Sequence, residues 1–377
     1  MRECRSLGVA APHELAFFEL PVPAVEPGGA LVHTWFSGLS SGTELTYVKG
    51  TNPAFTSRMD PDLCAFVPGD GARRYPVTAM GYMEVGEVAE SRREDLPVGT
   101  VVAAAYGHRS CHVVSGTDHV VPVPADIDPV LGVFLAQMGP IAANGLLHAA
   151  AEFRPHPDPA LGDGVRDRCV LVTGAGVVGL LTALLARRHG AAAVAVADPD
   201  PRRRAVAAAL GLELAEDPAD DPAADPAREP AGEAWRWCKD AWVHGHRDRG
   251  ADLVFQCRGR DAVLHDALRA LRPQGVVIDL AFYQGGASGL RLGEEFHHNG
   301  LTIRCAQINR VPRGLAGRWD RRRLSEETAA LLRADGPAIR EHLVTDVVPV
   351  DEAPELIGQL VRRERHALQI VLDFRRG

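Results

Sequence analysis

The stretch CVLVTGAGVVGLLTALLARRHG, residues 169–190, constrains the fold of this chain more than any other stretch. It places three glycines in Gly-x-Gly-x-x-Gly spacing between an apolar strand and an amphipathic helix, the context in which this pattern binds a dinucleotide. The first glycine permits a tight turn, the second lets a pyrophosphate approach the backbone, and the third lets helix and strand pack closely. Free N–H groups at the helix start would face the phosphates. A turn that has lost its ligand is the alternative interpretation. The residues expected at the cofactor are Gly174, Gly176, Val177, Val178 and Gly179.

A carboxylate follows the next apolar strand. Asp198 ends the stretch AAVAVAD about twenty residues after the glycines, where an acid accepts hydrogen bonds from the adenine-side ribose and repels a 2′-phosphate. We therefore expect NAD(H) as the cofactor, with NADP(H) disfavoured. Arg202, Arg203 and Arg204 follow, and one of them, with Arg203 as the candidate, could contact the cofactor. The simpler interpretation is that these arginines lie on a solvated helix face.

Strand and helix patterns alternate from residue 169 to about residue 282, which predicts a doubly wound α/β domain with a parallel sheet covered on both faces. The first third of the chain consists instead of short β-rich stretches broken by glycine. A helical pattern begins near Asp128 and Pro129, a favourable N-cap and first-turn pair. Residues 216–233 are rich in Pro, Ala and acids, so we expect an exposed loop there.

Composition excludes several classes of protein. A chain of 377 residues is long enough for two domains, and a net charge of −8 argues against nucleic acid or an anionic membrane as the main partner. The seven cysteines are scattered, without the close pairs of a zinc knuckle or a redox Cys-x-x-Cys motif. The N-terminal residues lack the apolar core of a secretory signal. We expect a cytoplasmic protein with reduced thiols.

Four further stretches carry a family resemblance: SGLSSGTELTYVKG, GYMEVGEV, YGHRSCHVV and FHHNGLTIRCAQINRVPRGLAGRWDRRR. With the glycine-rich turn, they resemble the medium-chain dehydrogenase/reductase superfamily, and within it the subgroup that includes bacteriochlorophyllide a dehydrogenase. The resemblance implies a GroES-like β-rich catalytic domain at residues 1–140, completed by residues 311–377. A Rossmann domain at residues 141–310 would lie between these segments, and the active site would lie in the cleft.

The zinc-ligand positions of the resembling family can be checked in this sequence. Zinc members carry a cysteine where this chain has Ser41, a His-Glu pair where it has Tyr82 and Met83, and a third ligand before a proline where it has Gly139. We therefore expect no zinc. A different set, His108, Cys111 and His112, is disfavoured because in a strand Cys111 would point away from the two histidines.

The missing metal leaves the proton donor open. Tyr82 is the first candidate because its hydroxyl would project toward the position that zinc occupies in relatives, although it could equally fill a void. Thr43 takes the position of the family's relay hydroxyl, and Glu84 follows Tyr82 closely; Glu44 is expected to orient loop N–H groups. Two sets of residues are weighed for the cofactor side: Phe282 and Tyr283 as contacts of the nicotinamide ribose, and His297 and His298 as either cleft residues or a surface pair.

These inferences favour a zinc-independent oxidoreductase that transfers a hydride between NAD(H) and a carbonyl or secondary alcohol. Its substrate would be a small hydroxylated metabolite such as a cyclitol or sugar-like polyol, or a tetrapyrrole side-chain alcohol. The alternatives are an enoyl or quinone reductase and a nucleotide-binding sensor without turnover. Residues 301–308, LTIRCAQI, would form an edge strand, which favours a homodimer.

Overall fold

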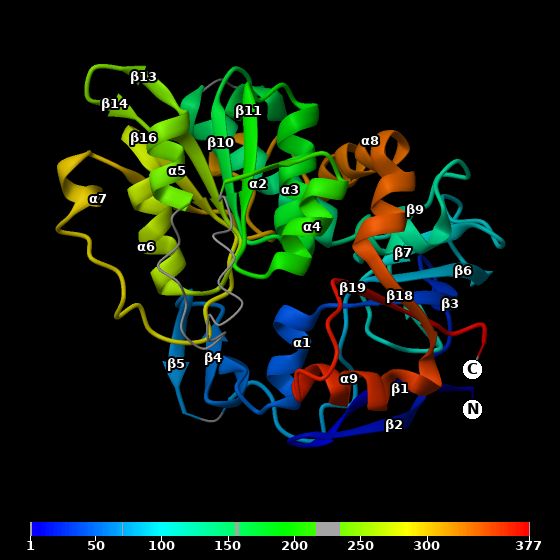
Figure 1. Cartoon of the computed structure of the whole chain (residues 1–377). Coiled ribbons are helices and arrows are strands. Elements are labelled where there is room, and N and C mark those ends of the chain that lie inside the picture. The colour runs from blue at the N-terminus through cyan, green and yellow to red at the C-terminus, as the bar shows by residue number, and fades with distance from the viewer. Residues whose placement is uncertain (1, 70, 155–157, 216–233, 377) are drawn as a thin grey trace. The chain divides into compact units, whose positions relative to one another are not determined.

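The computed structural model describes residues 2–69, 71–154, 158–215 and 234–376. It divides into two compact units, one formed by residues 1–137 and 339–377 and the other by residues 138–338 (Figure 1). The expected loop at 216–233 lies outside the described residues. No helix in the described ranges combines the length and apolarity that a membrane span requires.

The first unit is built on a seven-stranded sheet in the order β18-β19-β3-β6-β7-β9, with β8 paired to β3. All of its pairs are antiparallel except β18 with β19. Buried apolar residues such as Leu39, Val85 and Leu372 lie along its strands. The strands are β3 (Ala30–Leu39), β6 (Glu84–Ser91), β7 (Val101–Ala104), β8 (Cys111–Val114), β9 (Val121–Pro122), β18 (Val344–Pro349) and β19 (Gln369–Asp373).

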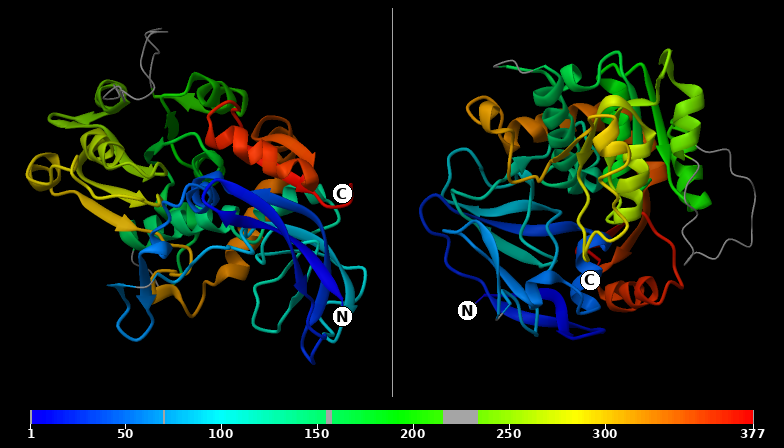
Figure 2. Two further views of the ribbon diagram at one scale, coloured as in Figure 1. Left: turned by 90° about the horizontal axis from the view of Figure 1, so that it is seen from below. Right: turned by 90° about the vertical axis from the view of Figure 1, so that its left-hand side faces the viewer.

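Smaller elements complete the first unit. A long hairpin, β1 (Glu3–Ala11) with β2 (Glu14–Pro21), lies beside the other strands of the unit (dark blue in Figure 2), and a second hairpin joins β4 (Ser57–Asp60) to β5 (Ala65–Pro68). Helix α1 (Ser41–Val48) follows β3 directly, and helix α9 (Ala353–Val361) contacts it. Because α1 begins immediately after β3, the polar residues of its first turn are held beside the end of a buried strand.

The second unit is a six-stranded parallel sheet in the order β12-β11-β10-β15-β16-β17. Helices cover both faces: α3 packs with α2 on one side, and α5 packs with α6 on the other (Figure 1). The strands are β10 (Cys169–Thr173), β11 (Ala193–Ala197), β12 (Glu213–Leu214), β15 (Ala251–Gln256), β16 (Leu271–Asp279) and β17 (Thr302–Cys305). A short ribbon pairs β13 (Val243–Gly245) with β14 (Asp248–Arg249). The helices are α2 (Met138–Phe153), α3 (Val177–Arg188), α4 (Pro201–Ala209), α5 (Ala234–Ala241), α6 (Asp261–Ala270), α7 (Glu295–His298) and α8 (Arg321–Ala338).

The α/β fold with a doubly wound parallel sheet and a separate β-rich unit is therefore the fold that the sequence predicts. The glycine-rich turn follows β10, which is flanked by β11 and β15 where the strand order reverses, the position at which open parallel sheets bind ligands. Strand β17 lies at the edge of the sheet, as expected for residues 301–308.

Two expectations about the chain's organisation need correction. Residues 311–338 belong to the second unit instead of completing the first, because α8 packs against α2 and α3 and the buried Trp319 donates its indole N–H to Pro159 O at 3.1 Å. The stretch around His108 is not one continuous strand: β7 ends at Ala104, β8 begins at Cys111, and Gly107 between them has a φ of +98°.

Candidate active site

The turn after β10 has the geometry of a phosphate-binding loop. Gly174 adopts a φ of +99°, which favours glycine. A Cβ on Gly179 would lie 1.8 Å from Gly174 O, so the first turn of α3 packs against the loop only because that position has no side chain. Gly176 is the N-cap of α3, and no side chain caps the helix there. The first N–H groups of α3 are thus left for an anionic ligand.

Asp198 is 4% exposed and is tied to this loop. Its Oδ2 accepts the N–H of Ala175 at 2.8 Å, and its Oδ1 accepts the N–H of Asp200 at 2.9 Å. A carboxylate has about four lone-pair sites, so each oxygen can still accept a further hydrogen bond from a ribose hydroxyl. The described contacts leave Asp198 suited to the cofactor role that its position after β11 predicts.

The three arginines at the start of α4 differ in their contacts. Arg202 binds Asp200, and Arg204 donates to the backbone oxygens of Asp198 and Pro199. Arg203 alone of the three faces the glycine-rich turn: its Nη1 lies 3.9 Å from Asp198 Oδ2 and 3.7 Å from the position of a Cβ on Gly176. Of the trio, Arg203 is therefore the one placed to contact a bound phosphate or ribose.

Aromatic residues follow β16 as expected, but they differ in surroundings. Phe282 is 50% exposed, whereas Tyr283 packs against the apolar core of the second unit. The Tyr283 hydroxyl is hydrogen-bonded to Asp279 and lies 3.4 Å from Nε2 of Gln256. Burial raises the pKa of Asp279, and burial together with Asp279 raises that of Tyr283. His297 and His298, the other pair weighed from the sequence, are exposed on α7.

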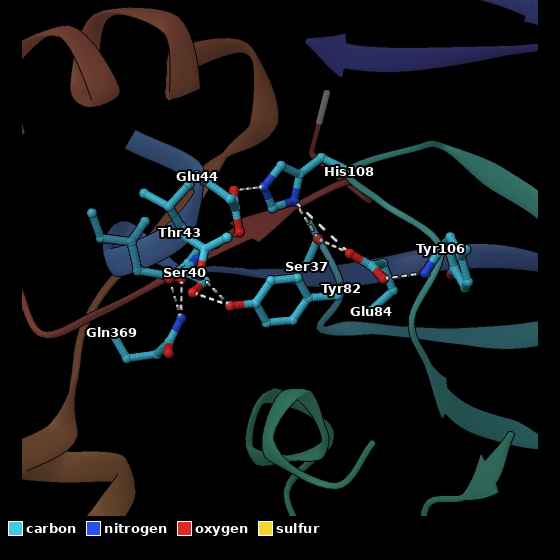
Figure 3. Close-up of polar contacts among 11 residues, drawn as sticks. Ser37, Ser40, Thr43, Glu44, Tyr82, Glu84, Tyr106, His108 and Gln369 are labelled. Carbon is cyan, nitrogen blue, oxygen red and sulfur yellow. Dashed lines mark hydrogen bonds and ion pairs between the residues drawn. The ribbon is translucent and has the colours of Figure 1, made fainter. Parts of the chain in front are cut away.

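In the first unit, three hydroxyl groups meet at the start of α1 (Figure 3). The Tyr82 hydroxyl forms a hydrogen bond with Ser40 Oγ and donates to Thr43 Oγ1 at 3.2 Å. Burial raises the pKa of Tyr82, and the nearby Glu44 carboxylate raises it further. Tyr82 is therefore a neutral phenol at ordinary pH, and two of the predicted catalytic residues, Tyr82 and Thr43, are in direct contact.

A second set of polar groups lies behind these hydroxyls. His108 is fully buried, with Nε2 2.6 Å from Glu44 Oε2 and Nδ1 2.6 Å from Ser37 Oγ. Burial opposes a charge on His108, but the attraction of Glu44 and the smaller effect of Glu84 outweigh it and raise the histidine pKa. Glu44 also accepts the Ser40 N–H at 2.8 Å, which confirms that it orients a loop N–H group.

Glu84 does not act on Tyr82 directly. Its Oε1 accepts from Ser37 Oγ at 2.9 Å, and its Oε2 accepts the Tyr106 N–H at 2.7 Å (Figure 3). Glu84 is completely buried, and burial raises its pKa despite the opposing effects of His108 and these hydrogen bonds. Glu84 is thus bonded to Ser37 and Tyr106, whereas the Tyr82 hydroxyl is bonded to Ser40 and Thr43.

The sequence alone did not reveal His108 as a partner of Glu44 or Ser40 as a partner of Tyr82. A local signal exists for His108: Gly81 has a φ of +101°, and a Cβ there would lie 2.8 Å from the His108 ring. The glycine before Tyr82 is therefore required so that the imidazole can lie against the backbone.

A zinc ion at the family's usual position does not fit these residues. The hydroxyls of Ser40 and Thr43 are both bonded to the Tyr82 hydroxyl, and Met83 is completely buried. Zinc sites use thiolate, imidazole and carboxylate donors instead. At Gly139 a Cβ would lie 2.0 Å from Thr328 Cγ2, which leaves no room for a ligand side chain.

The substitute set of His108, Cys111 and His112 also lacks support. Both nitrogens of His108 already have hydrogen-bond partners, and His112 stacks on Tyr106 with ring centroids 5.0 Å apart. In the part of the chain that the structure describes, the groups of potential ligands close enough to share an ion are Cys169–His244–Asp252 and His265–Glu294–Glu295, both in the second unit.

Comparisons with known proteins find dehydrogenases. Residues 177–315 match the family model "Zinc-binding dehydrogenase". D-guloside 3-dehydrogenase of Escherichia coli (strain K12) is 26% identical over 371 residues, covering 95% of this chain and 96% of that protein.

Solved structures share the fold. Alcohol dehydrogenase TADH from Thermus sp. ATN1 superposes with a TM-score of 0.69 at 21% identity, covering 98% of this chain and 99% of that chain. A short chain alcohol dehydrogenase from E. coli CFT073, solved with NADH, superposes with a TM-score of 0.70 at 16% identity, covering 99% of each chain. The chain is therefore similar over nearly its whole length to D-guloside 3-dehydrogenase, and it shares its fold with alcohol dehydrogenases.

Proposed function

We propose that this protein is an NAD(H)-dependent oxidoreductase that interconverts a carbonyl and a secondary alcohol without a zinc ion at the family's catalytic position. The observation that carries the proposal is the Tyr82–Ser40–Thr43 hydroxyl cluster at the start of α1, which offers hydroxyl groups instead of the usual zinc ligands. A bound nicotinamide supplies or accepts the hydride. The protein's own residues must then hold the cofactor, orient the substrate oxygen and manage one proton.

The second unit supports the cofactor part of the proposal. The uncapped start of α3 suits the pyrophosphate, and Asp198 suits the adenine-side ribose. A carboxylate at that position repels a 2′-phosphate, which favours NAD(H) over NADP(H). Arg203 lies 3.9 Å from the same carboxylate, and its charge partly offsets this preference.

Tyr82 is proposed as the proton donor in the reducing direction. Its raised pKa keeps the phenol protonated, which is the form that can donate to an oxygen that gains negative charge. Ser40 and Thr43 fix the direction of the hydroxyl, and Thr43 can return a proton after the transfer. In this scheme the phenol performs part of the charge stabilisation that a metal performs in relatives.

The substrate class rests on the relatives. The full-length relative acts on a D-guloside, and structural neighbours include an L-idonate 5-dehydrogenase and a 2R,3R-butanediol dehydrogenase. We propose a small hydroxylated metabolite of this kind, sugar-like or cyclitol-like. Reduction of an activated carbon–carbon double bond is the second candidate. Hydride addition to such a bond forms no alkoxide that a Lewis acid must stabilise, and the residues around Tyr82 offer no zinc ligands.

The proposal is tested with protein whose zinc has been quantified by elemental analysis. It is assayed with NAD⁺ against a panel of polyols and cyclitols, and with NADH against one ketone and one enone. We expect much less than one zinc per chain, activity that chelators do not change, and turnover of the alcohol or ketone. Turnover of the enone alone would favour the second candidate, and stoichiometric zinc that activity requires would overturn the zinc-free mechanism.

A further inference from the structure

Two cysteines lie directly opposite each other in the first unit. Cys4 lies in β1 and Cys111 begins β8, and both are free thiols. An antiparallel bridge pairs Ser6 with Arg109, so two residues further along the same register Cys4 faces Cys111. The two thiols are hydrogen-bonded to each other.

The backbone hydrogen bonds fix the register of the two strands. Leu7 N donates to His108 O at 2.9 Å, and Ser110 N donates to Arg5 O at 2.9 Å. These bonds flank the Ser6–Arg109 bridge, and the same register places Cys4 opposite Cys111. Cα atoms of residues directly opposite each other on antiparallel strands are about 4.5–5.5 Å apart, within the range of about 4.4–6.8 Å found in disulfides.

The surroundings favour reaction of these two sulfurs. Cys4 is 3% exposed, whereas Cys111 is half-buried and reachable from solvent. The hydrogen bond from Cys111 and the charge of Arg109 outweigh burial and lower the pKa of Cys4 to about 7. A thiolate is the form of cysteine that attacks oxidants and disulfides. The pair thus combines an accessible sulfur with a buried, acidic partner in contact with it.

We propose that Cys4 and Cys111 are a reversible oxidation site that closes to a cross-strand disulfide when the protein meets a peroxide or a small-molecule disulfide. With hydrogen peroxide, the Cys4 thiolate attacks one peroxide oxygen, which gives a sulfenic acid and releases hydroxide. Cys111 then loses its proton and attacks the Cys4 sulfur, which displaces a second hydroxide. The two thiols lose two electrons and two protons in total, and the peroxide is reduced to two molecules of water.

The crosslink would act on the segment that carries the buried histidine. His108 lies three residues before Cys111, and its carbonyl accepts the Leu7 N–H of β1. A disulfide would tie β1 to this segment covalently. The site is separate from the cofactor turn, so it does not depend on the proposed reaction.

The test uses a variant in which the two exposed thiols are removed, Cys64→Ser/Cys305→Ser, which leaves five of the seven cysteines. The protein is treated with oxidised glutathione or with hydrogen peroxide and mapped by mass spectrometry under non-reducing conditions. We expect a Cys4–Cys111 crosslinked peptide, a mass lower by roughly 2 Da, a loss of two titratable thiols, and complete reversal by dithiothreitol.

The matched control adds Cys111→Ser to the same background and should lose no pair of thiols. Under peroxide, the same Cys111→Ser variant should instead trap a sulfenic acid on Cys4, a result that does not depend on forming the crosslink. The proposal is overturned if no crosslinked peptide forms at an oxidant dose that modifies Cys64 and Cys305 in the unsubstituted protein. It is also overturned if thiols are lost equally from the Cys111→Ser control.

Discussion

Nε2 of His108 lies 2.6 Å from Oε2 of Glu44, and the two side chains are 0% and 1% exposed. With both nitrogens protonated, His108 donates to Glu44 and to Ser37, and the Ser37 hydroxyl is free to donate to Glu84. The same Glu44 carboxylate raises the pKa of Tyr82. Glu44 therefore connects the buried His108 to the hydroxyl cluster around Tyr82.

Removal of His108 should destabilise the protein. His108→Gln leaves Glu44 buried without its ionic partner, and breaking a buried pair costs about 3–5 kcal/mol. The free energy of unfolding from urea titrations at pH 7 should fall by that order. His112→Gln is the matched control, since His112 is partly buried and stacks on Tyr106 without such a partner; its cost should be much smaller.

The same pair predicts a pH dependence. The folded-state pKa of His108 is raised, so its stabilising contribution is complete below the unfolded pKa of about 6.5 and is lost as the pH rises through the higher folded value. The pKa of Glu84 is also raised, so its contribution to stability likewise falls as the pH rises, beginning at its lower unfolded pKa. Urea unfolding between pH 6 and pH 9 should show a steeper loss of stability for the wild type than for His108→Gln. Equal slopes would contradict a charged His108.

Two glycine variants should separate cofactor binding from folding. At Gly176 the nearest atom to an added Cβ is 3.7 Å away and φ is −84°, so Gly176→Ala should fold normally, yet its methyl group would block the approach of a pyrophosphate. Gly179→Ala places a Cβ 1.8 Å from Gly174 O and should lower the unfolding free energy by about 2 kcal/mol or more. Calorimetric titration of NADH and thermal melting measure the two effects. Wild-type NADH affinity in Gly176→Ala would contradict the assigned phosphate position.

The choice between cofactors should depend on Asp198. Asp198→Ala removes a ribose acceptor and the repulsion of a 2′-phosphate, so the preference for NADH over NADPH should narrow. Asp200→Ala, which removes a carboxylate two residues away that caps α4, should leave that preference unchanged. Dissociation constants for both cofactors measure the ratio. If the wild type prefers NADPH tenfold, Arg203 decides the choice and the account of Asp198 is wrong.

Assembly is expected to follow from β17. Its outer side is unpaired in the described sheet and invites pairing with a second copy across a two-fold axis. Light scattering at low micromolar concentration should give the mass of a dimer or of a multiple of it. A mass of about one chain under those conditions would count against the prediction.

Much of the fold could be predicted because its signals are local. Gly174, Gly176 and Gly179 specify a turn through the spacing of neighbours, and the apolar runs of β10, β11 and β15 are those of a sheet buried on both faces. The assignment of α8 failed because an amphipathic helix does not reveal which unit its apolar face contacts. Here that face lies on α2 and α3.

The site was predictable only in part, because its contacts join distant positions. Tyr82 and Thr43 were found from their places in a motif, but the contact of His108 with Glu44 spans 64 residues and depends on how β7, β8 and α1 converge. Strand alternation also could not relate Tyr82 to Glu84. Strand β6 begins only at Glu84, and Gly81 before Tyr82 has a positive φ, so Tyr82 lies outside the regular strand.

The turnover number of Tyr82→Phe relative to the wild type tests most directly the proposal that the Tyr82 phenol supplies the proton without a zinc ion. The assay uses zinc-quantified protein and the substrate found in the panel, with Tyr106→Phe as the control, since the Tyr106 hydroxyl binds Thr34 and not the Tyr82 cluster. Tyr82→Phe should lower turnover on the order of a hundredfold or more while NADH affinity stays unchanged, and Tyr106→Phe should stay within a few-fold of the wild type. Turnover of Tyr82→Phe near the wild-type value would contradict the account and leave the hydroxyl without a catalytic role.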